Sequence, residues 1–323
     1  MSSAPLDDFL LRHAPGPRVA IAPVVFEARA ALASATESLR PTPDQALEHP
    51  WRWRGGEADV RYGFYRILEL LEAAALDVAH ALGEASARTG LARAPSGDLA
   101  ALATAARWDL HGRLASLNEE VLDRDPGGGE WTVRRTLGHI VNGQRAYGWY
   151  TAWWLEQRIS DPAALPNRVP DDLGAELPDE EREGDGSLAE IRERLEATLD
   201  GSSEVFAGLG PSELALNARW SGIPVTIGFR IGRWSSHLRE HTLQVDKTLA
   251  AVGWQPREVD RLLGLLHGAY GRLESLVFTV TSELLEEPGA DGRDAAVIVS
   301  DALTTAEGHA QEVAAAAATA PGP

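Results

Sequence analysis

Apolar residues recur at three- and four-residue spacing along nearly the whole chain, and no convincing run alternates apolar with polar residues. This periodicity is typical of amphipathic helices, whereas alternation would indicate strands. The pattern predicts eight helices, at about residues 21–39, 58–83, 98–123, 132–158, 187–208, 226–251, 257–286 and 292–318. We therefore expect an all-α fold, because a helix with one apolar stripe has to pack that stripe against other helices.

The breaks between these segments fall where turn-forming residues gather. Runs rich in proline, glycine and acidic residues interrupt the pattern at residues 40–45, 125–129, 209–213 and 286–292. The run WRWRGG at residues 51–56 is interpreted as a packed turn between helices. Residues 161–186 are polar, with an acidic second half. This composition predicts a solvated crossover loop that is too polar to pack.

The chain contains a weak internal repeat. Residues 60–67 align with residues 133–140, and tryptophans precede both segments. Near the end of the chain, residues 308–313 echo residues 240–245, with an offset of one residue after the histidine. The repeat indicates that the chain holds two related helical regions.

This repeat predicts two bundles. Residues 98–253 would form one complete four-helix bundle, and the helix pairs within residues 18–93 and 256–320 would be the halves of a second one. The complete bundle would then be inserted in the long crossover of the divided bundle, and helical bundles with long crossovers are known. Tandem packing of helix pairs is the competing architecture, and the sequence leaves both open.

Composition excludes several classes of protein. Hydrophobic residues make up 44% and charged residues 24% of the 323 residues, which is the balance of an ordinary globular protein. No stretch predicts a membrane span or a secretory signal, so we expect a cytoplasmic protein. The net charge of −18 opposes binding to nucleic acids and anionic membranes. The lack of cysteine excludes disulfides, thiolate metal sites and a cysteine nucleophile.

Three histidines stand out by their context. His237 and His241 are four residues apart in a predicted helix, so both imidazoles lie on one face, one turn apart. His139 lies about one heptad into the helix that starts near Trp131. If these helices pack side by side, three neutral imidazoles can bind one metal ion and leave a position open for water or substrate. That is the pattern of a catalytic metal site rather than a closed structural one.

The sequence around these histidines resembles the DinB-like (DinB/YfiT) superfamily. The resemblance is carried by Gln244 and by the segments WTV, LGHI and RWSSHLREH at residues 131–133, 137–140 and 233–241, and it covers roughly residues 98–253. It implies a four-helix bundle in which His139, His237 and His241 bind a divalent metal, with zinc favoured and nickel or iron as alternatives.

The flanking halves resemble the family only faintly, as a degenerate second bundle. In the alignment above, Arg66 stands where His139 would, Thr305 stands where His237 would, and only His309 matches. The resemblance therefore implies a structural role for these halves. Family members often pair as homodimers, so we expect either a homodimer or a monomer in which the two bundles form an internal pseudo-dimer.

Several members of the family transfer groups to a low-molecular-weight thiol. Because this chain has no cysteine, such a thiol would have to come from outside. Lys247 is the only lysine among 30 basic residues, a bias typical of GC-rich bacterial genomes, and this favours mycothiol. The leading hypothesis is a metal-dependent thiol S-transferase acting on a small electrophilic metabolite. The alternatives are a metal-dependent isomerase or hydrolase and a non-catalytic helical binding protein.

Five further residues are candidates for binding substrate. Arg230, Arg233 and Gln244 share one helical stripe with His237 and His241, and an arginine can hold a carboxylate or hydroxyl with directional donors. Two candidates lie on the helix of His139, where one follows after a turn and the other after two turns: Asn142 and Tyr147.

Overall fold

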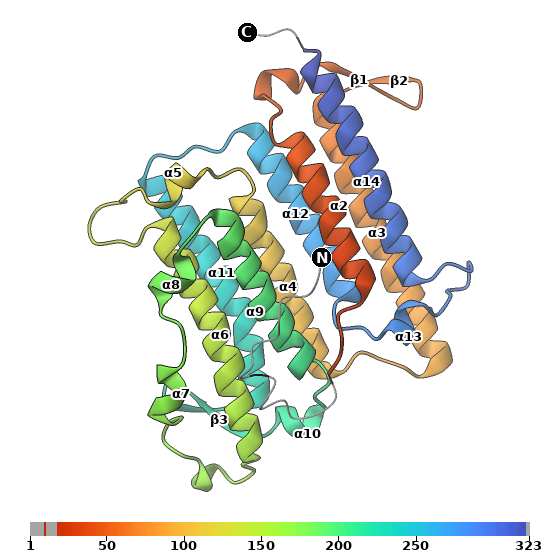
Figure 1. Ribbon diagram of the computed structural model, residues 1–323. Coiled ribbons are helices and arrows are strands. Elements are labelled where there is room, and N and C mark those ends of the chain that lie inside the picture. The colour runs from red at the N-terminus through yellow and green to blue at the C-terminus, as the bar shows by residue number, and fades with distance from the viewer. Residues whose placement is uncertain (1–9, 11–17, 321–323) are drawn as a thin grey trace. The chain divides into compact units, whose positions relative to one another are not determined.

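The computed structural model describes residue 10 and residues 18–320 of the chain (Figure 1). These residues divide into two compact units. We call the first the central unit, which comprises residue 10 and residues 18–21, 93–107 and 118–254 of the described chain. The second is the divided unit, which comprises residues 22–92, 108–117 and 255–320. Each unit is a helical bundle, so the predicted all-α fold is confirmed.

Four long helices build the central unit. They are α4 (Pro95–Leu114), α6 (Val133–Gln157), α9 (Leu188–Phe206) and α11 (Ile227–Ala251). Helix α6 packs against both α9 and α11, and a 2.7 Å ion pair between Arg107 and Asp200 joins α4 to α9. The shorter elements of the unit are α5 (Glu119–Leu122), η2 (Pro162–Ala164), α7 (Asp171–Ala175), α8 (Glu180–Gly184), α10 (Pro211–Leu214), β3 (Asn217–Trp220) and β4 (Ile223–Thr226). The boundary with the divided unit falls inside α4, after Arg107.

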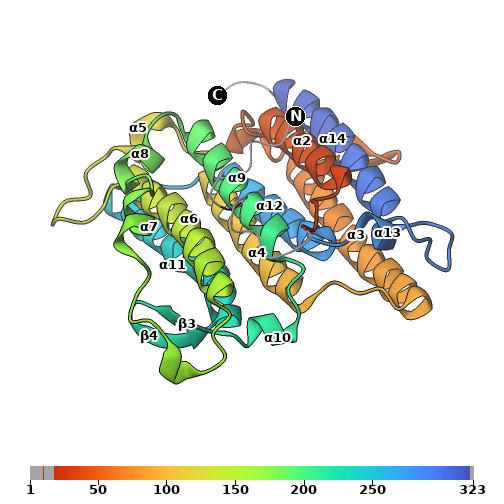
Figure 2. The same ribbon diagram turned by 60° about the horizontal axis from the view of Figure 1, so that its bottom comes forward.

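The divided unit is also built from four long helices, which run side by side in the views of Figure 1 and Figure 2. They are α2 (Pro23–Leu39), α3 (Val60–Thr89), α12 (Glu258–Val277) and α14 (Ala295–Ala318). Helix α14 packs on α2 and α3, and α12 packs on α3. A buried ion pair between Arg29 and Glu274, 2.8 Å long, joins α2 to α12. The shorter elements are η1 (Asp44–Ala46), β1 (Pro50–Trp53), β2 (Gly56–Asp59) and α13 (Ser282–Leu285).

Two of the predicted helices are too long. The helix predicted at 98–123 divides into α4 and α5, because Asn118 accepts a 3.1 Å hydrogen bond from the Val121 N–H and caps a new helix. The helix predicted at 257–286 divides into α12 and α13. There Thr279 adopts a φ of 60°, a left-handed conformation that a right-handed helix does not contain.

Each unit also contains one short antiparallel hairpin that the apolar periodicity does not predict. The run at 51–56 is not a turn between helices but most of the β1–β2 hairpin. In both hairpins a two-residue turn joins four-residue strands, and its residues have positive φ: Arg54 (50°) and Gly55 (78°), and Ser221 (49°) and Gly222 (80°). This is the left-handed turn that matches strand twist. The strands are too short to show alternation in the sequence.

The prediction that residues 161–186 form a solvated loop too polar to pack was wrong. Helix α8 packs against α6, and the Glu183 side chain is 2% exposed and accepts a 2.6 Å hydrogen bond from Arg145. Gly138 makes this approach possible, since a Cβ atom there would lie 2.2 Å from the Glu180 backbone oxygen. An acidic segment can therefore be buried where arginines pair with its carboxylates.

The hairpins correct the repeat alignment. Counted from the hairpin turns, Trp53 and Trp220 hold the same position, and their strands have the same register. Arg66 stacks over Trp53 at 4.8 Å, as Arg233 stacks over Trp220 at 5.4 Å. Helix α3 thus corresponds to α11 rather than to α6, and Arg66 corresponds to Arg233 rather than to a histidine.

Helix α14 then corresponds to α6. A short helix and a Pro-Gly pair precede both, and Thr132 and Asp294 cap them in the same way. Counted from the helix caps, the divided unit has Asp301 at the position of His139. Along α3, the residues in place of His237 and His241 are Leu70 and Ala74. In the divided unit the third and fourth helices of the bundle precede the first and second, which is a circularly permuted order.

Candidate metal centre

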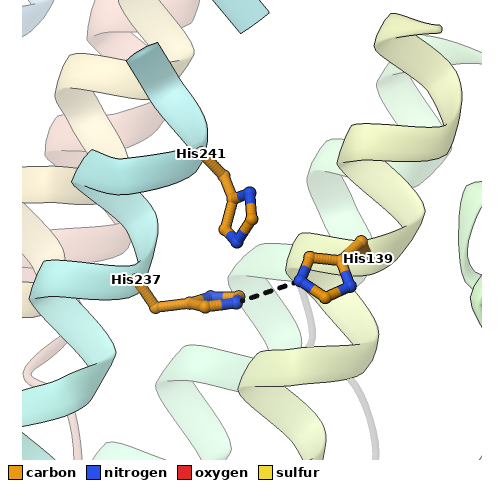
Figure 3. A group of neighbouring side chains, drawn as sticks. All are labelled: His139, His237 and His241. Carbon is orange, nitrogen blue, oxygen red and sulfur yellow. Dashed lines mark hydrogen bonds between the residues drawn. The ribbon is translucent and has the colours of Figure 1, made fainter. Parts of the chain in front are cut away.

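Three histidines from two helices of the central unit point toward one another (Figure 3). His139 comes from α6, and His237 and His241 come from successive turns of α11. The Nε2 atoms of His139 and His237 are 3.4 Å apart, and one ring nitrogen from each of the three lies within 4.8 Å of the others. Nitrogens bound to one tetrahedral zinc at about 2.0–2.1 Å would be roughly 3.4 Å apart. The spacing therefore suits a single metal ion.

Hydrogen bonds to the other ring nitrogens favour the same use. The Nδ1–H of His139 donates to Glu180 Oε1 at 2.6 Å, and that of His241 donates to Gln244 Oε1 at 2.8 Å. The Nδ1 of His237 lies 3.3 Å from the Nε2 of Gln144, which also donates to the Trp234 backbone oxygen. The protonated Nδ1 atoms of His139 and His241 leave their Nε2 lone pairs free to bind a metal. The donor set thus fits a divalent ion.

The surroundings keep the imidazoles of His237 and His241 neutral. Burial, followed by the neighbouring His241 and His139, lowers the pKa of His237 to about 3. Burial also lowers the pKa of His241, although its hydrogen bond to Gln244 acts in the opposite direction. Only a neutral imidazole binds a metal. At neutral pH no proton therefore has to leave His237 or His241 before a metal binds.

Two close contacts position the rings. A Cβ atom on Gly143 would lie 2.7 Å from the His237 Cε1 atom, so the glycine lets this ring rest against the backbone of α6. The Trp131 ring meets the His139 ring edge-on, with their centroids 5.0 Å apart. Contacts with the α6 backbone and with Trp131 thus restrict the orientation of the His237 and His139 rings, in addition to the hydrogen bonds.

Comparison with known proteins agrees with this arrangement. Residues 102–245, a little under half of the chain, match the family model of the DinB superfamily. These residues form a DinB superfamily domain. They include the three histidines, and the resemblance stated above is confirmed at this level. Neither a search of curated proteins nor a search of solved structures found a match. Among the described residues, no helix has the length and apolar character needed to cross a membrane.

The DinB domain brings some of the predicted substrate-binding residues close to the histidines. Gln244 holds His241, as described above. The Tyr147 ring packs edge-on against the His237 ring, with a centroid distance of 5.2 Å. Arg230 lies on the same face of α11, about two turns before His237, and is 3% exposed.

The other two predicted residues are occupied elsewhere. The Asn142 side chain donates to the Pro178 backbone oxygen, so it secures the segment that leads into α8. Arg233 stacks over Trp220 and forms an ion pair with Glu240. The Arg233 charge also contributes to lowering the pKa of His237 and of His241.

Two residues of the site were missed by sequence reasoning. Glu180 lies in the segment interpreted as a solvated loop, and only the folding of α8 onto α6 brings it to His139. Gln144 is buried on α6, and its amide bridges the Trp234 backbone oxygen and the ring of His237. Glu180 could have been found only by asking which carboxylate would orient a metal-binding histidine.

Proposed function

We propose that this protein is a metal-dependent thiol S-transferase, with mycothiol as the favoured thiol and a small electrophilic metabolite as its second substrate. The observation that carries the proposal is the convergence of one ring nitrogen from each of the three histidines, with the rings of His139 and His241 oriented by hydrogen bonds at Nδ1. Three protein ligands leave room for an exogenous ligand. A chain without cysteine has to take its thiol from solution.

The metal would supply a Lewis acid that keeps a bound thiol deprotonated at neutral pH. Zinc is favoured, with nickel and iron as alternatives. The thiolate sulfur then forms a C–S bond, and the leaving group departs with the electron pair of the bond that breaks. The chain's own part is to hold the three imidazoles in place, through Glu180, Gln244 and Gln144, so that little has to move when the reactants bind.

The divided unit has a different part in this proposal. Its positions equivalent to the three histidines are occupied by Asp301, Leu70 and Ala74, which cannot form the same site. We propose that it is a degenerate copy with a structural role, and that the predicted domains at 98–253, 18–93 and 256–320 correspond to these two copies.

The test starts with the metal. Purified untagged protein is expected to contain about one divalent ion per chain, and the triple variant His139→Ala, His237→Ala, His241→Ala is expected to contain none. His309→Ala, in the divided unit, is the matched control and should keep the ion. No metal after reconstitution, or equal metal in the triple variant, would overturn the proposal.

The second step tests the thiol. Mycothiol, bacillithiol and glutathione are titrated into the metal-loaded protein and then supplied with monobromobimane, whose bromide is displaced when a C–S bond forms. We expect one thiol to bind and to react faster with the enzyme than without it, and His237→Ala to abolish the difference. A metal-loaded protein that binds none of these thiols would contradict the transferase and leave the isomerase or hydrolase to be tested.

A further inference from the structure

Arg230 is a buried cation without a carboxylate partner among the described residues. Its Nε donates to Thr151 Oγ1 at 3.1 Å, and its Nη1 donates to the Arg219 backbone oxygen. Its Nη2 is buried and has no hydrogen-bond partner. The side chain as a whole is only 3% exposed. An arginine in this state usually pairs with an anion, because burying an unpaired charge is strongly unfavourable.

The side chains around Arg230 connect it to the three histidines. Tyr147 and Tyr150 lie close enough to Arg230 to influence the pKa of its guanidinium, and Tyr147 also packs on His237. Burial raises the pKa of Tyr150, so this hydroxyl stays neutral and offers a hydrogen bond rather than a negative charge. Burial lowers the pKa of Arg230 to about 10, which leaves it protonated at neutral pH. Arg230 and Tyr150 together thus present hydrogen-bond donors and one positive charge.

The divided unit shows that the fold does not need this cation. Counted from the hairpin turn, the position of Arg230 is taken there by Gly63, and counted from the helix cap, that of Thr151 is taken by Val313. A Cβ atom on Gly63 would lie 2.3 Å from Val313 Cγ2, so the two helices pack directly through small and apolar groups. In the divided unit, the positions equivalent to Arg230 and Thr151 are therefore filled by Gly63 and Val313, without a charged side chain.

We propose that the Arg230 guanidinium binds a carboxylate of the co-substrate that reacts at the three-histidine centre. A carboxylate is the anion whose planar oxygens match a guanidinium best. That the carboxylate belongs to a reactant rests on the proposed function; that Arg230 binds one does not. The carboxylate can come from the electrophile or from the thiol, and the two sources are separated below.

The first experiment compares crotonate with crotonamide, which have nearly the same shape and differ in charge. Binding to the metal-loaded protein is measured by calorimetry, without any thiol. We expect crotonate to bind, and to bind at least tenfold more weakly to Arg230→Met, while Arg230→Lys loses less because it keeps the charge. Arg239→Met removes an exposed arginine from the same helix and should bind like the parent protein.

Two outcomes would overturn the proposal. One is that crotonate and crotonamide bind alike, or that neither binds. The other is that Arg230→Met and Arg230→Lys both bind crotonate as the parent protein does. Thermal melting shows whether the variants fold. If Arg230→Met does not, the comparison of Arg230→Lys with the parent decides, and an unchanged affinity would count against the proposal.

The second experiment identifies the source of the carboxylate. N-acetylcysteine and its amide are compared as thiols in the same variants. If Arg230→Met weakens binding of the acid but not of the amide, the thiol supplies the carboxylate. If only crotonate binding changes, the electrophile supplies it. Failure of every thiol to bind would contradict the transferase. Equal binding of crotonate and crotonamide would contradict the role of Arg230.

Discussion

The central and divided units share a bundle and differ in chemistry. Both have a hairpin with the same register and an arginine stacked over a tryptophan, Arg233 over Trp220 and Arg66 over Trp53. In the central unit, three histidines lie where α6 and α11 meet. The equivalent positions on α14 and α3 of the divided unit hold no histidine. The features present in both units are therefore those that build the fold, and the features present in one are candidates for function.

The same comparison applies to the residues that support the histidines. Gly138 and Gly143, which allow α8 and the His237 ring to approach α6, are replaced in the divided unit by Ser300 and Thr305. Glu180 has no counterpart, because it lies in the connection between α6 and α9. In the divided unit the counterparts of α6 and α9 are α14 and α2. Because α2 precedes α14 in the chain, no connection equivalent to the one that contains Glu180 is present. The supporting residues are thus absent together with the ligands.

The largest expected effect tests whether the metal belongs to the central unit alone. His237→Ala removes one of three ligands, and we expect the protein to lose its ion on dialysis. Leu70→Ala, at the equivalent position of the divided unit, should keep about one ion per chain. Metal analysis of both dialysed variants by mass spectrometry checks this. Loss of metal in Leu70→Ala alone would show that the correspondence between the units is wrong.

Acid should destabilise the metal-free protein through His237. Its pKa is about 3 when folded and ordinarily about 6.5 when unfolded. Between these values the unfolded chain binds more protons, so the stabilising effect present above pH 6.5 is lost as the pH falls toward 3, by up to about 5 kcal/mol.

His237→Leu copies the divided unit and removes this proton uptake. Chemical denaturation of the metal-free proteins at several pH values is the measurement, and His139, His241 and Arg233 stay in place as the neighbouring charges. Below pH 6.5, we expect the free energy of unfolding to depend less on pH in the variant than in the parent protein. Parallel curves for the two proteins would show that His237 is not buried in its neutral form.

Glu180→Gln should weaken metal binding without abolishing it. The carboxylate orients His139 through a 2.6 Å hydrogen bond, and loss of such a partner typically costs about 10–100-fold in metal affinity. Competition with a chromophoric chelator gives the affinity. Glu181→Gln, at the exposed neighbouring position, is the control and should be silent. An unchanged affinity in Glu180→Gln would indicate that α8 packs near the metal site without supporting it.

Much of this fold could be predicted from the sequence because its signals are local. Helical periodicity located the long helices, and residue types at fixed spacing singled out His139, His237 and His241. The hairpins could not be found in this way, since four-residue strands are too short for a pattern. The repeat is visible in the sequence, but the neighbouring residue types pair Arg66 with His139. The hairpins show instead that Arg66 corresponds to Arg233.

The supporting residues were beyond prediction for a different reason. Glu180 reaches His139 from a distant part of the chain, and its approach depends on the absence of a side chain at Gly138. Arg230 was singled out by its position on a helical stripe, but spacing could not show that it is buried without a carboxylate partner. Such features depend on packing between segments that are distant in sequence.

The smallest expected effect concerns what the units share. An arginine stacked over a tryptophan contributes about 0.5–1 kcal/mol at partly exposed sites, so Trp53→Leu and Trp220→Leu should each destabilise their own unit by a similar amount. Thermal melting followed by circular dichroism measures this, and metal content is measured alongside. Both variants should keep the ion, because the stack builds the hairpin and touches no ligand. If Trp220→Leu alone loses metal, the hairpin of the central unit would support the metal site as well as the fold. A feature that both units share would then contribute to function in one of them.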